Sequence, residues 1–157
     1  MMTGKDMGRT IAWATLVAGT LDIASAFVWS GRVVPVLRTV ASGPFGDAIA
    51  EGPAGAPLGL LTHFAIMALM VTAYVAAAGR IPAVNRYWWI AGLLYGVALW
   101  IVMYWVVMPL RWESYQTPRE PVAIAKQLFS HCILTGLPIA WITARMQSTR
   151  APEFRAA

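Results

Sequence analysis

Four side chains that can bind or exchange protons lie inside stretches of sequence that are otherwise apolar. Asp22 interrupts the first stretch, and the only two histidines of the chain, His63 and His131, lie in the second and the fourth. Tyr104 adds a phenol hydroxyl in the third stretch. A carboxylate and two imidazoles can take up protons, bind a cation or ligate a transition metal. Because polar groups are costly to bury in lipid, these four residues are the candidate site.

The residue types leave the chemistry of this site open. The candidate residues could bind a proton, a cation or a small ligand, or the two histidines could hold a haem iron, or a transition metal together with Asp22. Neither metal arrangement has a compact motif such as H-E-x-x-H behind it. The simplest alternative is that each polar side chain only bonds a neighbouring helix. No nucleophile is recognisably paired with a base, which leans against an enzyme without deciding the question.

The elements that would position these residues are membrane-spanning helices. The chain is 59% hydrophobic and 12% charged, whereas soluble domains have roughly 25% charged residues. Four apolar runs lie at residues 11–29, 58–78, 87–110 and 127–144. Each is near the roughly 20 residues that a helix needs to cross the hydrocarbon core. We therefore predict an all-α fold: an up-down four-helix bundle that forms a single transmembrane domain over residues 1–157.

The basic residues predict the orientation of this bundle. Seven of the twelve Lys and Arg residues precede the first run, separate the second from the third or follow the fourth. The other five share the first and third connections with four acids. By the positive-inside rule, both termini are cytoplasmic. The basic residues are scattered singly, so the net charge of +5 does not indicate a nucleic-acid partner.

The first run also has a rival interpretation as a secretory signal peptide. Lys5 and Arg9 precede it, and Ala24-Ser25-Ala26 resembles a cleavage site. Cleavage there would leave an odd number of spans and invert the charge bias that remains. We therefore favour an uncleaved first span.

The connections differ in length and character. Residues 31–57 predict a short segment that lies on the outer surface or re-enters the membrane, because an apolar stretch is followed by several glycines and prolines. Gly79 is expected to end the second helix, and Pro82 to set a tight turn. Residues 145–157 form a polar C-terminal tail.

Helical spacing predicts how the polar residues and the small residues are used. Counting from the span boundaries places all four candidate residues in the outer half of the membrane, where an up-down bundle could bring them together. His131 shares a helix face with Gln127 and Thr135. Pro138 is expected to kink the fourth helix, and Gly92 and Gly96 form a small-residue face suited to close contact within the bundle or between protomers.

Three short motifs resemble a known family. They are Thr62-His63-Phe64 in the second run, Met108-Pro109-Leu110 at the end of the third and Leu128-Phe129-Ser130-His131 at the start of the fourth. They are similar to segments of the small bacterial inner-membrane proteins typified by YagU, over roughly residues 55–145. The resemblance implies a multi-pass protein of the bacterial inner membrane whose biochemical activity is not settled.

Together these observations predict the class of protein. We expect a small multi-pass protein of the bacterial inner membrane whose buried Asp/His cluster binds a proton, a cation or a small ligand. Its partners would be the lipid bilayer and either a second copy or another membrane subunit. The first alternative is a structural or accessory subunit of a membrane complex. The second is a redox protein that holds haem or a metal.

Overall fold

The computed structural model describes residues 4–148, and within them the chain is helical between short turns, with no strand. The elements are α1 (Gly4–Ser30), α2 (Val33–Phe45), α3 (Asp47–Ala50), α4 (Gly55–Arg80), α5 (Pro82–Arg86), α6 (Trp88–Ile101), η1 (Val102–Val107), α7 (Met108–Arg111), α8 (Pro121–Leu128), η2 (Phe129–Gly136) and α9 (Leu137–Ser148). η1 and η2 are π-helical segments inside longer helices. The predicted all-α fold is confirmed for these residues.

Four helices are long and apolar enough to cross a membrane: Gly4–Ser30, Gly55–Arg80, Trp88–Arg111 and Pro121–Gln147. Each coincides with one predicted apolar run. Three of them extend beyond the run at both ends, because backbone hydrogen bonding continues into polar residues while apolarity marks only the part matched to hydrocarbon. The first four residues of the predicted polar tail belong to α9, and the rest of that tail lies outside the described residues.

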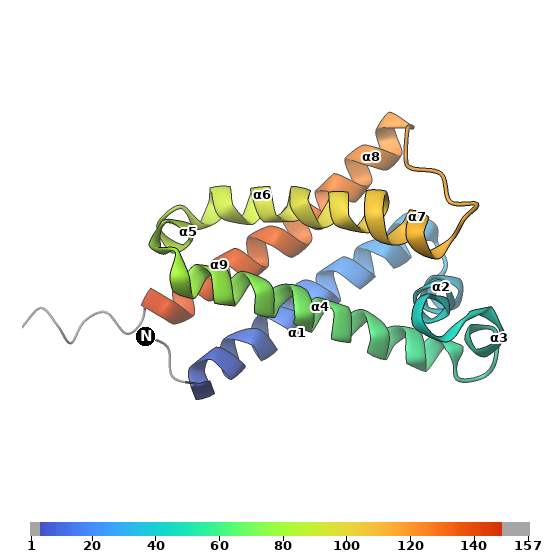
Figure 1. The fold of residues 1–157 in the computed structure, drawn as a ribbon, viewed down its shortest axis with the longest axis horizontal. Helices are drawn as coiled ribbons and strands as arrows, with labels where there is room; N and C mark the ends of the chain where they lie inside the picture. The colour runs from blue at the N-terminus through green and yellow to red at the C-terminus, as the bar shows by residue number, and fades with distance from the viewer. Residues whose placement is uncertain (1–3, 149–157) are drawn as a thin grey trace, which may run out of the picture.

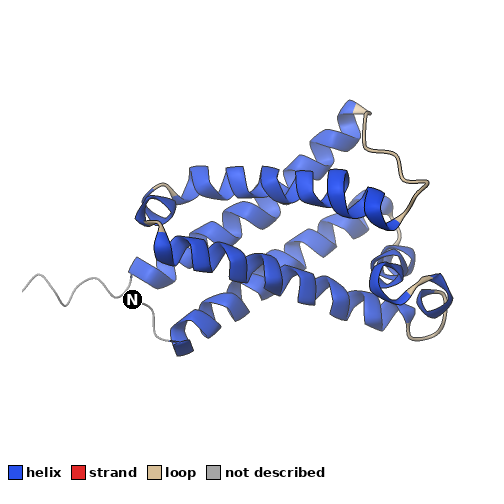
Figure 2. Cartoon of the chain, in the orientation of Figure 1, coloured by secondary structure: helices blue, strands red, loops and turns tan. Residues whose placement is uncertain are grey.

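The four long helices pack through a small set of contacts. α1 packs against α4 and also against η2 and α9, and both η2 and α9 pack against α6. Successive long helices run in opposite directions in Figure 1, so α5 lies at one end of the molecule with the start of α1 and the end of α9. The short helices α2, α3 and α7 lie at the other end, and the turns are confined to the two ends (Figure 2).

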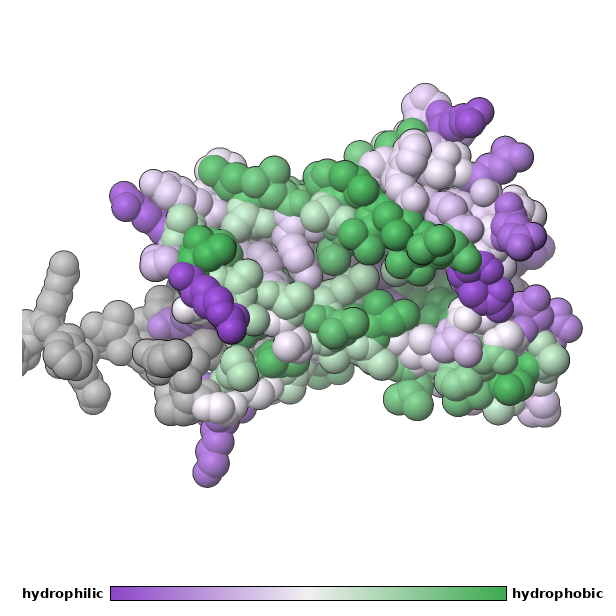
Figure 3. All heavy atoms as spheres, viewed as in Figure 1, coloured by the Kyte–Doolittle hydropathy of each residue, from purple (hydrophilic) through white to green (hydrophobic). Residues whose placement is uncertain are grey.

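The outer surface of the molecule is apolar around its middle. Figure 3 shows hydrophobic side chains over the middle of the molecule and hydrophilic ones gathered at its two ends. Leu61, Leu69, Leu94 and Leu110 are each more than 60% exposed. Only 17% to 28% of the residues in the four most apolar windows are buried inside the protein. Such a surface would be poorly solvated by water and fits a hydrocarbon environment.

Small residues allow the third and fourth long helices to approach closely. A Cβ atom added at Gly96 would lie 2.5 Å from the carbonyl oxygen of His131 and from the Cα atom of Cys132. One added at Gly92 would lie 2.9 Å from the carbonyl oxygen of Gly136. The small-residue face predicted at Gly92 and Gly96 is therefore used within the bundle, where it fixes the position of η2 against α6.

The connection between α4 and α6 corrects one prediction. α4 continues through Gly79 to Arg80, so the expectation that Gly79 ends this helix is wrong. Ile81 instead adopts an extended conformation, with φ −119° and ψ 97°. Pro82 follows it, and a proline disfavours the helical conformation of the residue before it. Pro82 therefore sets the turn, as predicted, and opens α5.

Residues 31–57 contain the short helix that the sequence predicts. Gly31 has φ 65°, a left-handed conformation that lets the chain turn sharply after α1. α2 is seen nearly end-on in Figure 1 and so runs across the end of the bundle. It packs against the start of α4, where a Cβ atom on Gly59 would collide with the backbone carbonyl of Leu37.

Arg111, at the end of α7, connects α2 to the bundle through hydrogen bonds. Its Nε donates to the carbonyl oxygen of Gly43 at 2.8 Å, and its Nη2 donates to that of Ser42 at 2.5 Å. These carbonyls lie in the last turn of α2, where a positive charge is favourable. A carboxylate oxygen of Asp47 lies 3.9 Å from Nη2. The guanidinium group, which comes from a distant part of the chain, therefore supplies hydrogen bonds to carbonyl oxygens in the last turn of α2.

We expect Arg111→Gln to loosen α2 without unfolding the four long helices. Hydrogen bonds to a charged donor contribute roughly 1.5 to 3 kcal/mol, and glutamine cannot bond both carbonyls in the same geometry. Hydrogen–deuterium exchange should become faster in residues 33–45 and stay unchanged in α6. Arg119→Gln, which removes the same charge from the exposed loop before α8, is the control. Equal exchange in the two variants would contradict the role of Arg111.

Candidate functional site

A pocket of about 400 Å³ lies between α1, η1, α8 and η2, near the end of the molecule that carries α2. Three of the four predicted site residues, Asp22, Tyr104 and His131, line it. They come from the first, third and fourth long helices. The tertiary structure therefore brings together polar groups from three separate apolar stretches of the sequence.

Asp22 is the acidic group of the pocket. Its Oδ1 accepts a hydrogen bond of 3.2 Å from the hydroxyl of Thr135, which is almost completely buried on η2. Among the residues that the structure describes, no Lys, Arg or His nitrogen lies within 4.0 Å of this carboxylate. An ionised acid in an apolar helix costs roughly 2.5 to 3.5 kcal/mol to insert into a membrane. Within residues 4–148, no ion pair with this carboxylate offsets the cost.

A directed chain of hydrogen bonds joins α1 to η2 beside Asp22. Ser25 donates to the main-chain carbonyl of Asp22 at 2.8 Å, and its hydroxyl lies 2.8 Å from that of Ser130. The indole N–H of Trp29 donates to the same Ser130 oxygen at 3.2 Å. Because the proton of Ser25 is already used, Ser130 donates to Ser25. The chain therefore runs from Trp29 through the two hydroxyls to the backbone of Asp22.

His131 presents a basic nitrogen at the pocket. Its Nδ1 lies 3.0 Å from the carbonyl oxygen of Gln127 and therefore carries the donated proton. In the neutral ring this leaves Nε2 as the nitrogen that can accept a proton. The ring packs against Tyr104, with centroids 5.7 Å apart. Gln127 is itself oriented by the indole of Trp100, which donates to its Oε1 at 3.0 Å.

His63 lies outside this pocket, in the contact between α1 and α4. Its Nε2 lies 2.9 Å from the carbonyl oxygen of Gly19, to which it donates, and the side chain is 8% exposed. Gly19 has no side chain, so α4 approaches closely: a Cβ there would lie 2.8 Å from the ring of Phe64. The structure therefore assigns His63 to helix packing and separates it from Asp22, Tyr104 and His131.

We expect His63→Ala to destabilise the protein by about 1 to 3 kcal/mol, since it removes a buried hydrogen bond and leaves a cavity. His131→Ala should cost less, because His131 already borders open space in the pocket. Melting temperatures of both variants in detergent would check this order. A larger loss for His131→Ala would show that the two histidines have been assigned the wrong way round.

The geometry does not fit the metal arrangements that the sequence left open. Within residues 4–148, no three His, Cys, Asp or Glu side chains form a group that could hold a metal ion. Asp22, His63 and His131 therefore do not make a common ligand set. The two histidines also do not share a pocket, as a haem between them would require, and Nε2 of His63 already bonds a backbone carbonyl.

Two features of the pocket were not predicted from the sequence. The first is a pair of further polar side chains, Ser25 and Lys126, which both line the pocket. The signal for each is helical spacing: Ser25 follows Asp22 by three residues, and Lys126 precedes Ser130 by four. Lys126 is held over the ring of Trp29, with its Nζ 5.4 Å from the ring centroid. The cation therefore lies on an aromatic face and makes no ion pair with Asp22.

The second feature is the π-helical geometry itself. Tyr104 lies in η1, and both Ser130 and His131 lie in η2. Each π-helical segment ends two residues before a proline, Pro109 or Pro138. A proline ring clashes with the carbonyl four residues earlier and removes its hydrogen bond, which a wider turn relieves. π-Helical turns are frequent at functional sites, and here both contribute side chains to one pocket.

In comparisons with known proteins, no family model, no curated protein and no solved structure matches this chain. The resemblance to the YagU-like proteins therefore stays a prediction that rests on its three short motifs.

Proposed function

We propose that this protein is a small multi-pass protein of the bacterial inner membrane, folded as an up-down four-helix bundle with both termini in the cytoplasm. The apolar surface around the middle of the molecule and the four long apolar helices support the lipid environment. The excess of basic residues near the termini and α5 supports the orientation. In this placement α2 lies on the outer surface and does not re-enter the membrane, because it runs across the end of the bundle.

The pocket that contains Asp22 and His131 binds a proton or a small cationic ligand from the outer side of the membrane. The observation that carries this proposal is a half-buried carboxylate that lines a pocket of about 400 Å³ and has no cationic partner among the described residues. A proton or a bound cation would neutralise it. A proton on Asp22 or a positive ligand beside it is the least costly way to keep this acid in an apolar helix.

The other pocket residues have distinct roles in this proposal. Nε2 of His131 is a second acceptor for a proton or for a donor group of the ligand. The ring of Tyr104 packs on His131 and limits its motion. Thr135 orients the Asp22 carboxylate, and the hydroxyls of Ser25 and Ser130 hold α1 against η2. The pocket is therefore built in advance of binding.

The first test measures binding by the wild-type protein. The melting temperature in detergent should rise when small organic cations, such as guanidinium or short-chain amines, are added at millimolar concentration at pH 7. A ligand at 100 times its dissociation constant stabilises a protein by about 2.7 kcal/mol. Neutral amides and amine-free alcohols of equal size are the control, and a rise of equal size with these would contradict the proposal.

The main alternative is a structural or accessory subunit, and the bond between Thr135 and Asp22 is the observation that favours it. In that case the polar residues hold helices together and Asp22→Leu would lower the melting temperature strongly. In the binding proposal, Asp22→Leu leaves stability unchanged or raises it, because residues kept for function are not optimised for stability. The same purified proteins serve both tests.

A further inference from the structure

Lys126 is a charged group of the Asp22 pocket that the proposed function does not use. It lies on α8, the first segment of the fourth long helix, and it is an exposed residue that lines the pocket. Its Nζ lies 5.4 Å from the ring centroid of Trp29, and it makes no ion pair among residues 4–148. A cation–π contact leaves N–H groups of an ammonium available to an acceptor. The pocket therefore offers a positive group as well as a negative one.

Asp22 and Lys126 are held apart along the pocket. Oδ1 of Asp22 bonds Thr135 on η2. Lys126 instead lies over Trp29, which follows Asp22 by seven residues on α1. At 1.5 Å per residue, the levels of the two charged groups differ by about 10 Å. A ligand that bonds both groups over about 3 Å at each end would therefore carry its own charges about 4 to 6 Å apart.

The walls between the two charged groups suit a short carbon chain. Ala26 lines the pocket one helical turn after Asp22, and its small side chain leaves room there. The ring of Tyr104 lines the pocket from η1 and packs against that of His131. A volume of about 400 Å³ is within the usual range of small-molecule sites. It is more than a proton or a single ammonium group needs.

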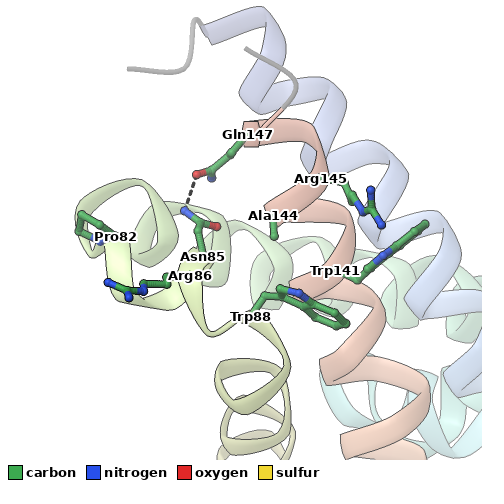
Figure 4. A pocket seen from close by; sticks show the side chains of 8 residues that line it. All are labelled: Pro82, Asn85, Arg86, Trp88, Trp141, Ala144, Arg145 and Gln147. Carbon is green, nitrogen blue, oxygen red and sulfur yellow. Dashed lines mark hydrogen bonds between the residues drawn. The ribbon is translucent and has the colours of Figure 1, made fainter. Parts of the chain in front are cut away.

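A second pocket, of about 550 Å³ at the opposite end of the molecule, provides a contrast. Figure 4 shows its lining, which comes from α5, the start of α6 and α9. Nδ2 of Asn85 donates there to Oε1 of Gln147 at 2.6 Å, and no acid is among the described residues that line this pocket. It therefore has no carboxylate to pair with an ammonium group. Of these two pockets, the Asp22 pocket alone has a partner for each charge of a zwitterion.

We propose that the Asp22 pocket binds a zwitterion whose primary ammonium group and acid group are separated by two or three carbon atoms. The ammonium group pairs with Asp22, and the acid group accepts from Nζ of Lys126. One such ligand neutralises both charges, whereas a simple amine neutralises one. The inference rests on the proposed function, because it keeps Asp22 as the cation-binding group. Two sources have this chemistry: a soluble ω-amino acid and the headgroup of phosphatidylethanolamine.

Titrations of the purified protein in detergent at pH 7 test this inference. 4-Aminobutyrate should bind about 3- to 5-fold more tightly than butylamine, which lacks the acid group; the gain is modest because water screens an exposed lysine. Lys126→Gln should remove this preference and leave the affinity for butylamine unchanged. Lys5→Gln is the matched control, because it makes the same chemical change in the first turn of α1, away from the pocket. It should keep the preference.

Lipid titrations distinguish the two sources of the zwitterion. Phosphatidylcholine is the control for phosphatidylethanolamine, because its quaternary ammonium has no N–H group to donate to Asp22. Tighter binding of phosphatidylethanolamine than of both phosphatidylcholine and 4-aminobutyrate would assign the site to a lipid headgroup. Tighter binding of 4-aminobutyrate would assign it to a soluble zwitterion.

The results that overturn the inference are distinct from those that overturn the proposed function. Equal affinities of the wild-type protein for 4-aminobutyrate and butylamine, together with equal affinities for the two lipids, would overturn the inference alone. So would tighter binding of glycine than of 4-aminobutyrate, or an equal loss of preference in Lys5→Gln and Lys126→Gln. Binding of neither amines nor zwitterions would overturn both. The comparison of ligands uses the wild-type protein, so it decides even if Lys126→Gln does not fold.

Discussion

Asp22→Asn is expected to weaken cation binding by about 10- to 100-fold while the melting temperature of the unliganded protein changes little. A hydrogen bond to a charged group contributes roughly 1.5 to 3 kcal/mol, and each 1.4 kcal/mol is tenfold in affinity. Asparagine keeps an oxygen that can accept from Thr135, so the contact between α1 and η2 survives the substitution. Titration of the variant with the cation found for the wild-type protein measures the loss.

Asp47→Asn makes the same chemical change at the same end of the molecule. Asp47 is 73% exposed and lies 3.9 Å from Arg111, a pairing that contributes little at a surface. This control should bind like the wild-type protein. If Asp22→Asn binds equally well, the carboxylate is not the binding group. If it binds poorly only because it has unfolded, the structural alternative is favoured.

Gly96→Ala is expected to destabilise the protein, because it adds a methyl group where α6 packs closely against η2. The new Cβ would lie 2.5 Å from the backbone of η2, at the His131 carbonyl oxygen and the Cys132 Cα, and backbone atoms cannot move aside as a flexible side chain can. Overpacking of this kind costs about 1 to 3 kcal/mol, or roughly 2 to 12 °C in melting temperature. Heating in detergent followed by size-exclusion chromatography measures it.

The same substitution should also impair the pocket. Because η2 carries His131 and Ser130, any displacement of η2 from α6 changes the distance between these residues and α1. Gly79→Ala is the matched control, since a Cβ at Gly79 meets nothing within 4 Å. Alanine also favours helix over glycine by roughly 1 kcal/mol, so this variant should be unchanged or slightly more stable. Equal losses in the two variants would contradict the packing argument.

Much of the architecture could be predicted because lipid imposes a simple rule on sequence. A helix that crosses hydrocarbon must be apolar over its whole length, so the four runs were visible without knowledge of their contacts. The role of Pro82 followed from the restricted geometry of proline. The exact helix ends did not follow, because residues 4–10 form helix although they are not an apolar run. Gly79 failed as a stop signal because glycine permits a helix end but does not require one.

The candidate site, like the fold, could be predicted from the sequence only in part. The sequence by itself determined which side chains are costly to place in lipid, and so it found Asp22, His131 and Tyr104. It could not separate His63 from them, because whether a histidine borders a cavity or a helix contact depends on the facing helix. That was decided by Gly19, which admits His63 and Phe64 to the surface of α1. Tertiary structure alone decided that Thr135 bonds Asp22, at a sequence separation of 113, and that η1 and η2 open into one pocket, because neither contact leaves a local pattern in the sequence.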